Sequence, residues 1–228
     1  MMDNLAPDAV AARHPSTPHR EQELARSSTR DNALSEDVLV KTALQIISRK
    51  GAAGFTMRDL ADALHVSPMA AYHHVASKDE LLRLVGNHVW AAVEVPPADA
   101  GPWYERLRTV LLMERNATKS YQGLYDAVLY LDVERKRTLE DTLLDLILDA
   151  GYPPVLAVPA YRTLMSWIAG HSAIESSLRD PNRRRPSGWG KAQRLTYDRE
   201  LMPEMNADEY FTFGLDTMIA GLRAILDD

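Results

Sequence analysis

The sequence predicts an all-α protein, and three observations lead to that prediction. Apolar residues recur at intervals of three and four through most of the 228 residues, which is the spacing of one helix face. Residues with side-chain oxygens stand directly before these runs, where they cap helix N-termini. No stretch shows the alternation of apolar and polar residues that is typical of a half-buried strand.

Composition is that of an ordinary globular protein. Hydrophobic residues make up 46% and charged residues 25% of the chain, which suffices for a substantial core. Cysteine is absent, so a disulfide framework and a thiolate metal site are both excluded. The sequence has no long apolar run and no apolar segment near its start, so we expect neither a membrane span nor a signal peptide. The expected location is the cytoplasm.

The net charge of −6 is unusual for a protein that binds DNA, so its distribution matters. Lys plus Arg and Asp plus Glu number 4 and 5 in residues 1–34, 6 and 6 in residues 35–90, and 16 and 21 in residues 91–228. The excess of acidic residues therefore lies mainly in the C-terminal part. A few placed phosphate contacts are compatible with this distribution, whereas unspecific coating of DNA is not.

Residues 1–34 are rich in Ala, Pro, Ser, Thr and Arg without a sustained period, and we expect a disordered arm. A solvated tail is the favoured interpretation, and an arm in the DNA minor groove is the alternative. The arginines that the alternative would use are Arg13, Arg20, Arg26 and Arg30.

The first helix is expected to begin after Ser35 and to end near Gly51. Its apolar stripe consists of Val40, Ala43, Leu44 and Ile47. Thr56 then caps a second helix, and a tight turn at His65 leads to Ser67, which caps a third.

The third helix, residues 68–74, has only two turns and must be held by packing against its neighbour. Pro68 at its first position presets φ without losing a hydrogen bond. Its outer surface carries rings and hydrogen-bonding groups that suit a DNA groove and its phosphates, from Met69, Tyr72, His73 and His74.

A fourth helix opens with the capping box of Ser77 and Glu80 and is expected to reach about Val93. The segment PPADAGP then ends it. Lys78 stands in its first turn, where a positive charge opposes the helix dipole. A phosphate approaching the same helix end would explain the lysine.

The pattern T-M-R-D-L-A-x-x-L-x-V-S-P-M-A-x-Y-x-H-V-x-S-K-D-E-L-L, which begins at Thr56, resembles the DNA-binding domain of the TetR family of one-component transcriptional regulators. With the preceding helix, the resemblance covers about residues 35–90. It implies a helix-turn-helix domain at 35–93, whose fourth helix links it to a regulatory and dimerisation domain at 94–228. The chain departs from the family at His65, where Gly is usual, and the turn is expected to carry about 1 kcal/mol of strain.

The resemblance implies that two copies of the third helix enter successive major grooves about 34–36 Å apart. Phosphates would be held by Thr56, Tyr72 and Lys78, and bases would face Met69, Ala70 and His73. Arg58 would reach either. The full set of expected DNA contacts is Thr56, Arg58, Ser67, Pro68, Met69, Ala70, Tyr72, His73, His74 and Lys78.

The remainder also reads as helix. Helices are expected at 102–119, 121–131, 133–150 and 155–179, and a last one follows Asn206 with Glu209 at the box position. Residues 180–206 interrupt the pattern with prolines, glycines and the basic run Arg183–Arg185, which we interpret as a solvated loop face.

An apolar stripe with small residues runs along the last helix. It consists of Tyr210, Phe213, Gly214, Thr217, Met218, Gly221, Leu222 and Ile225. The last two long helices of the family pack against their symmetry mates in a four-helix interface, and the stripe suits that use. The alternative is that the stripe is buried within its own domain.

The sequence contains no phosphate loop, no H-E-x-x-H and no G-x-S-x-G, so we expect neither an enzyme nor a cofactor. The adjacent His73 and His74 point to different faces, and no metal site is expected. A small-molecule pocket remains, with aromatic walls and a few polar groups. Its expected lining is Trp90, Met113, Tyr121, Tyr125, Trp167, His171 and Glu175, although most of these residue types belong more often to a core.

The resulting hypothesis is a homodimeric regulator that binds a DNA operator and responds to an unidentified small-molecule effector, as a repressor rather than an activator. A ligand between the C-terminal helices would move the 78–93 helix and change the separation of the two DNA-binding helices. The alternative is a DNA-binding protein of the same fold without such an effector, controlled by a protein partner or acting architecturally.

Overall fold

The computed structural model describes residues 34–179 and 205–227, and every regular element in these ranges is helical. The all-α prediction is confirmed. The helices are α2 (Glu36–Gly54), α3 (Met57–Leu64), α4 (Pro68–His74), α5 (Lys78–Trp90), the short 3₁₀ helix η1 (Ala98–Ala100), α6 (Trp103–Thr118), α7 (Leu124–Val128), α8 (Glu134–Asp149), α9 (Pro154–Arg179) and α10 (Ala207–Asp227).

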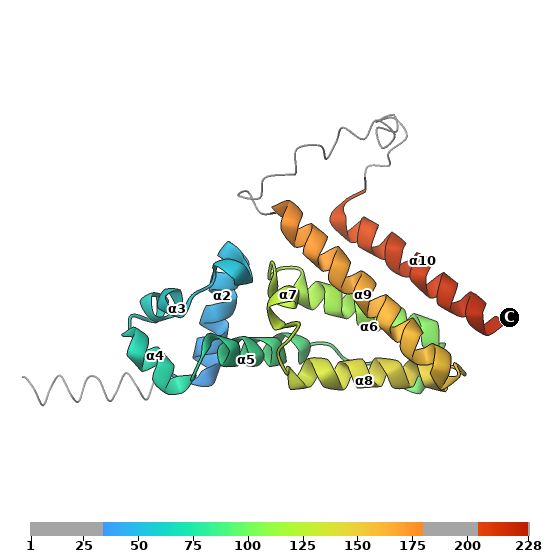
Figure 1. Ribbon diagram of the computed structural model, residues 1–228, viewed down its shortest axis with the longest axis horizontal. Coiled ribbons are helices and arrows are strands. Elements are labelled where there is room, and N and C mark those ends of the chain that lie inside the picture. Colours follow the sequence, from blue (N-terminus) through green and yellow to red (C-terminus); the bar gives the residue numbers. More distant parts are fainter. Residues whose placement is uncertain (1–33, 180–204, 228) are drawn as a thin grey trace, which may run out of the picture.

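The molecule has two parts that α5 connects (Figure 1). Helices α2, α3 and α4 lie at one end, and α5 runs from them into a larger group formed by α6 to α10, in which α9 and α10 lie side by side. The expected arm and basic loop, with Arg13, Arg20, Arg26, Arg30 and Arg183–Arg185, fall outside the described residues. In the part of the chain that the structure describes, no helix is long and apolar enough to cross a membrane.

The predicted caps of the first helices are confirmed. The side-chain oxygen of Ser35 accepts from Val38 N–H, and that of Ser67 accepts from Ala70 N–H. Thr56 forms a complete capping box, which unites the turn before α3 with the first residues of that helix.

The box predicted at the start of α5 is only half present. The Ser77 hydroxyl accepts from Glu80 N–H at 3.1 Å, as expected. The Glu80 carboxylate, however, accepts from the N–H of Ala76 and not from that of Ser77. The carboxylate therefore stabilises the turn that follows α4 rather than the first residue of the cap.

The turn between α3 and α4 has the conformation that the sequence predicts. His65 adopts φ 55° and ψ 39°, the left-handed region, and among the described residues it is the only non-glycine with positive φ. Its N–H bonds to Asp62 O, and the N–H of Val66 bonds to Ala61 O at 3.0 Å. These bonds cap the carbonyl end of α3.

Two helices are shorter than predicted. Helix α5 ends at Trp90 instead of about Val93, so the chain leaves the helix well before Pro96. The helix expected over 121–131 contains only Leu124–Val128, because Gly123 adopts φ 71° and separates α7 from the turn before it. The other long helices of the C-terminal part lie within one residue of their expected limits at 103–118, 134–149 and 154–179.

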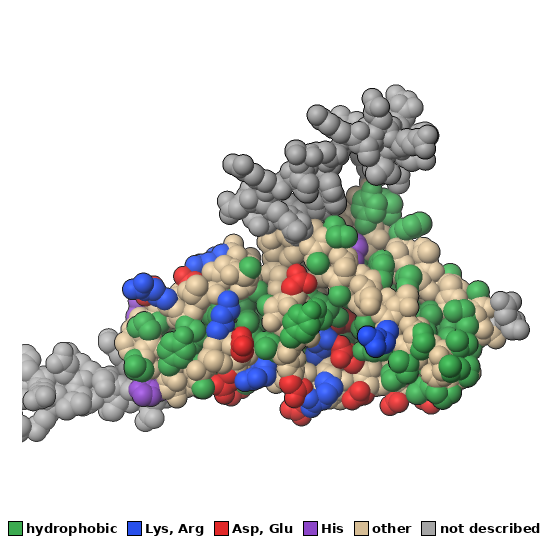
Figure 2. Space-filling view, in the orientation of Figure 1, with side chains coloured by type: hydrophobic (Ala, Val, Ile, Leu, Met, Phe, Trp, Pro, Cys, Tyr) green, Lys and Arg blue, Asp and Glu red, His purple; other side chains and the backbone are tan. Residues whose placement is uncertain are grey.

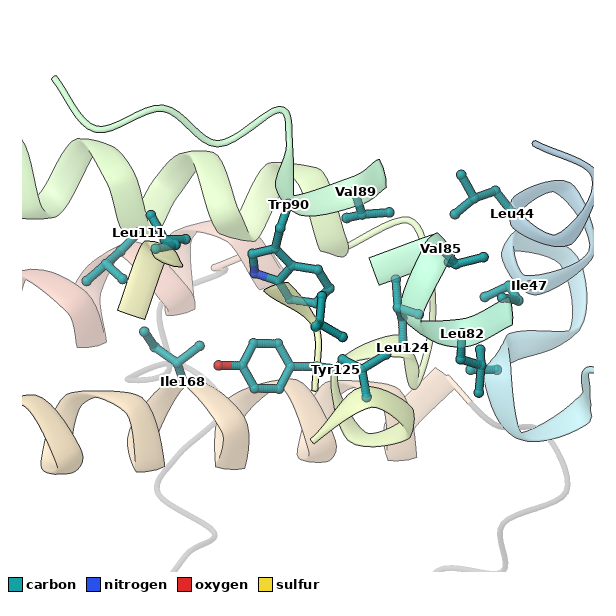
Figure 3. Packing of buried hydrophobic residues seen from close by; sticks show 14 of the residues in the cluster. Leu44, Ile47, Leu82, Val85, Val89, Trp90, Leu111, Leu124, Tyr125 and Ile168 are labelled. Carbon is teal, nitrogen blue, oxygen red and sulfur yellow. The ribbon is translucent and has the colours of Figure 1, made fainter. Parts of the chain in front are cut away.

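One continuous core joins the two parts through α5 (Figure 3). Near α2, Leu82 and Val85 pack in the neighbourhood of Ile47, and at the other end Trp90 lies beside Tyr125. Helix α8 also approaches α5 closely, since a Cβ at Gly86 would lie 2.9 Å from Val133 Cγ1. Helix α5 is therefore packed directly against helices of both parts.

Gly214 allows α9 and α10 to approach each other. A Cβ built on Gly214 would overlap Cζ2 of the Trp167 indole, so the small residue serves packing inside the chain.

We expect Gly214→Ala to lower the free energy of unfolding by about 1–3 kcal/mol, because the added methyl group has no space. Denaturant unfolding at fixed protomer concentration measures the loss. As a control, the same substitution in a Trp167→Leu background should cost less, because the indole that blocks the methyl group is gone. Equal losses in the two backgrounds would contradict this account.

Candidate DNA-binding surface and regulatory core

Helix α4 is presented to solvent at one end of the molecule. It buries Ala71 completely, and Val75 directly after it is 2% exposed. On its outer side Met69 is 68% exposed and Tyr72 is 44% exposed. In Figure 2, hydrophobic side chains and histidine share the surface over this end of the molecule. A two-turn helix with one small buried residue is thus held by α3 and offers its other side to a partner.

The structure brings all ten expected DNA contacts to this end. Eight of them are exposed: Thr56, Arg58, Ser67, Pro68, Met69, Tyr72, His73 and His74. Ala70 and Lys78 are half-buried. None of the ten is fully buried, although the Lys78 ammonium is directed at main-chain carbonyls of its own chain. Their contact with DNA stays a prediction.

Thr56 is occupied by its cap. Its hydroxyl donates to Asp59 Oδ2 at 2.8 Å and accepts from the Asp59 N–H at 3.2 Å. Asp59 also forms an ion pair with Lys50 at 2.6 Å, and the hydrogen bonds from Lys50 and Thr56 hold the pKa of that carboxyl below its usual range. Because a hydroxyl has a single proton, Thr56 would have to release Asp59 before it could donate to a phosphate.

Lys78 has a structural role that the sequence did not reveal. Its ammonium donates to Phe55 O at 2.7 Å and to Ala52 O at 3.4 Å, and it lies 5.7 Å from the centre of the Phe55 ring. We call residues 51–56, which run from the interruption of α2 at Gly51 to the cap of α3, the α2–α3 turn. Its carbonyl groups therefore explain a positive charge at the start of α5. Lys78 first of all orients this turn, and a phosphate would have to share its ammonium.

The seven residues of the expected pocket separate into distinct groups. Trp90 and Tyr125 lie together in the core, with ring centres 5.9 Å apart and exposures of 2% and 4%. Trp167 and His171 form an outer group on α9, with ring centres 5.6 Å apart. Glu175 belongs to the outer group, Tyr121 lies at the α6–α7 corner, and Met113 is half-buried on α6. Trp90 and Tyr125 are packed in the core while the others lie on separate elements, and contact of these seven residues with a ligand stays a prediction.

Glu114 is a buried acid that the sequence analysis missed. It is 4% exposed, and its carboxylate accepts from the Trp90 indole N–H at 2.9 Å. Burial raises the pKa of this carboxyl, and the hydrogen bond from Trp90 and the charge of Lys136 oppose the rise. Lys136 itself pairs with Glu140 and lies 5.4 Å from the centre of the Tyr125 ring. The sequence signal that could have revealed Glu114 is its position on α6, one turn beyond the buried Val110 and Leu111 and therefore on the same buried face.

We expect Glu114→Gln to flatten the dependence of stability on pH. The folded-state pKa of Glu114 lies above its unfolded value, so the folded protein binds the extra proton and its stability falls as pH rises from the unfolded pKa through the raised one. An amide keeps an acceptor for the Trp90 N–H and cannot titrate. Urea unfolding between about pH 4 and pH 8 measures the slope, and an unchanged slope would contradict the prediction.

The outer group is organised around Arg115, which is 8% exposed. Its guanidinium pairs with Glu175, reaches Asp208 at 3.3 Å and lies 5.1 Å from the centre of the Phe211 ring. Burial lowers the pKa of the neighbouring His171, and the charge of Arg115 acts in the same direction. These contacts connect α6 to α9 and to the start of α10, so we interpret the group as an ion-pair network that stabilises the fold.

Two cavities adjoin the α6–α7 corner. A groove of about 390 Å³ lies between α2, His88 and Tyr121. A smaller cavity of about 20 Å³, with room for a single water molecule, is lined by residues that include Gln122, Ser176 and Glu175. Of the expected pocket residues, Tyr121 lines both and Glu175 lines the smaller one. Among the described residues, no cluster of three or more His, Cys, Asp or Glu is placed to hold a metal ion.

Two family models match the chain. Residues 39–85 match the model described as bacterial regulatory proteins, tetR family, and residues 95–226 match the model of the tetracyclin repressor-like C-terminal domain. Together the two matches cover both parts of the fold.

Curated relatives agree with the family models. An HTH-type transcriptional regulator of Saccharopolyspora erythraea is 33% identical over an alignment of 86 residues, and the match covers 35% of this chain and only 36% of that protein. The tetracycline repressor protein class C of Escherichia coli is 25% identical over an alignment of 211 residues, and the match covers 84% of this chain and 92% of the relative.

Solved structures show the same fold. The TetR family protein ActR of Streptomyces coelicolor, in complex with (S)-DNPA, has a TM-score of 0.62 at 27% identity, and the match covers 84% of this chain and 98% of ActR. Mycobacterium smegmatis BioQ, with its natural double-stranded DNA operator, has a TM-score of 0.62 at 25% identity, and the match covers 84% of this chain and 99% of BioQ.

Proposed function

The chain belongs to the TetR family of bacterial regulatory proteins and is a transcriptional regulator, and from this premise we propose that it is a homodimeric repressor that a small molecule releases from its DNA operator. The domain limits that go with the proposal are residues 35–93 for DNA binding and 94–228 for regulation and dimerisation. The observation that carries the proposal is the exposed outer side of α4.

Groove reading by α4 is supported by its exposed side chains. Met69 offers an apolar contact and His73 offers a ring nitrogen. Contacts of both kinds can read base edges, which differ between base pairs in the major groove. Arg58 on α3 is exposed beside them and would add a charged contact to a phosphate or a base. BioQ has been solved with a DNA operator, so a relative of the same fold does bind a duplex.

Dimerisation is supported by apolar side chains that α9 and α10 leave exposed. Val155 and Ile174 on α9 are 76% and 58% exposed, and Phe213 and Ile225 on α10 are 66% and 50% exposed. Such large apolar residues on two adjacent helices suit a four-helix contact with a second copy. Two residues of the stripe expected from sequence pack inside the chain instead, since Leu222 is buried and Gly214 faces Trp167. For these two residues, burial within their own domain is the better interpretation.

Effector control is supported by the packing of α5. This helix shares one core with α2 and with the regulatory helices, and its last residue, Trp90, is bonded to Glu114 of α6. ActR has been solved with small molecules. A ligand that moves α6 or α8 would shift α5 and thereby the separation of two α4 helices in a dimer.

Selection of duplexes from a random pool tests the proposal. The full-length protein should enrich a pseudopalindrome with two half-sites about one helical turn apart. His73→Ala should change the preferred bases, whereas Lys78→Ala should weaken binding to all duplexes alike and lower its salt dependence. Selection that enriches no sequence would overturn the proposed function.

Regulation without a small-molecule effector is the second candidate, and the tight packing around Trp90 and Tyr125 favours it. Thermal-shift screening of the purified protein distinguishes the two candidates, because a ligand that prefers the folded state raises the melting temperature. A compound that raises the melting temperature and releases the selected duplex supports effector control.

A further inference from the structure

The α2–α3 turn is held by a hydrogen bond that it donates to Gln122, by one within the turn and by one that it accepts from Lys78. The N–H of Ala52 donates to Gln122 O at 2.8 Å, across the boundary between the two parts of the molecule. The carbonyl of Ala52 accepts from the N–H of Phe55 at 3.3 Å and from the Lys78 ammonium at 3.4 Å. The turn leads directly into Thr56 and α3, so its position sets that of the helix that supports α4.

Gln122 connects this turn to α9. Its side-chain amide donates to Ser176 O at 2.7 Å, while its own carbonyl accepts from Ala52. One half-buried residue at the α6–α7 corner thus bonds a regulatory helix with its side chain and the DNA-binding part with its main chain.

Gly51 makes the close approach possible. It adopts φ 73°, a conformation that side chains rarely allow, and a Cβ at this position would lie 3.3 Å from Gln122 O. The interruption of α2 at Gly51 also turns the Ala52 N–H away from the helix ladder and toward Gln122. The sequence of this turn is therefore adapted to the contact with the regulatory part.

We propose that Gln122 is a positioning residue through which α9 holds the α2–α3 turn and thereby sets the orientation of α3 and α4 for DNA. The inference rests on the proposed function and adds a second connection to the one that α5 provides. The two connections differ in kind, because α5 acts through apolar packing and Gln122 through directional hydrogen bonds that a small displacement breaks. Withdrawal of Ser176 from Gln122 would release the turn while α5 stays in place.

The test uses Gln122→Glu in the full-length protein. A carboxylate has the shape of the amide but cannot donate to Ser176 O, so the connection to α9 is lost. Gln45→Glu is the matched control, because Gln45 is exposed on α2 and undergoes the same change of charge. Gln122→Ala serves as a second variant, since it removes the amide without adding charge.

Hydrogen exchange is the first measurement. Exchange of the amides in residues 51–56 should rise about tenfold in both Gln122 variants and stay at the wild-type rate in Gln45→Glu. Wild-type exchange in the Gln122 variants would overturn the inference and leave the proposed function intact.

Half-site spacing is the second measurement, since a merely structural role would not change it. On duplexes selected by the wild-type protein, discrimination against a spacing altered by one base pair should fall about fivefold in the Gln122 variants. Faster exchange with unchanged discrimination would overturn the positioning role. If neither the wild-type protein nor the Gln45→Glu control selects a duplex, the proposed function is overturned instead.

Discussion

Trp90→Ala is expected to lower the free energy of unfolding by about 4 kcal/mol, the largest stability loss that we predict for this protein. Trp90 is 2% exposed and is among the largest fully buried side chains, so its removal leaves a cavity between α5 and α7. It also removes the indole N–H that the buried Glu114 carboxylate accepts at 2.9 Å. An acid left without its donor in the core adds to the cost.

Trp90→Phe separates the two contributions. The phenyl ring fills most of the cavity but has no N–H, so we expect a loss of about 1–3 kcal/mol from the unsatisfied acid and the smaller ring. The double variant Trp90→Phe, Glu114→Gln should recover part of that loss, because a neutral amide costs less to bury than a carboxylate. Guanidinium unfolding at one protomer concentration measures all three proteins. A loss below about 1 kcal/mol for Trp90→Ala would show that the core collapses around the gap.

Local signals predicted most of the DNA-binding part. Ser35, Thr56 and Ser67 cap helices because a side-chain oxygen meets an N–H three residues on, and this spacing is visible in the sequence. His65 adopts the left-handed conformation because the short three-residue link between α3 and α4 requires a sharp turn directly after α3. The first residue of a helix was predicted correctly wherever a cap and apolar spacing agreed.

The contacts that the sequence did not predict join residues far apart in the chain. Lys78 bonds Phe55 O, and Gln122 bonds both Ala52 and Ser176. Main-chain acceptors carry no sequence signature, so these partners follow only from the fold. The separation of the expected pocket residues into groups was also not visible in the sequence, because periodicity places Trp90 and Trp167 on apolar faces without saying whether these faces meet.

Helix α10 shows how a periodic stripe can serve two faces. Phe211 and Leu215 are buried against the rest of the chain, whereas Phe213 is 66% exposed. Two residues along a helix are separated by about 200° around its axis, so Phe213 points away from the face that Phe211 covers. Exposure of so large an aromatic side chain is unfavourable in water, and contact with a second copy would bury it.

Phe213→Asp is expected to abolish the dimer, because it would bury an unpaired carboxylate at the proposed contact between two copies. Sedimentation velocity at micromolar protein should show a monomer. Affinity for a two-half-site duplex should fall by about 10²–10³-fold, because the second half-site then no longer binds as part of the same complex. Tyr130→Asp is the matched control: Tyr130 is 94% exposed in the α7–α8 connection, and the variant should remain dimeric and bind with wild-type affinity. A Phe213→Asp protein that stays dimeric would show that another surface joins the two copies. If the variant is a folded monomer, its α4 should still bind a single half-site weakly. Weak half-site binding therefore distinguishes loss of the dimer from loss of the fold.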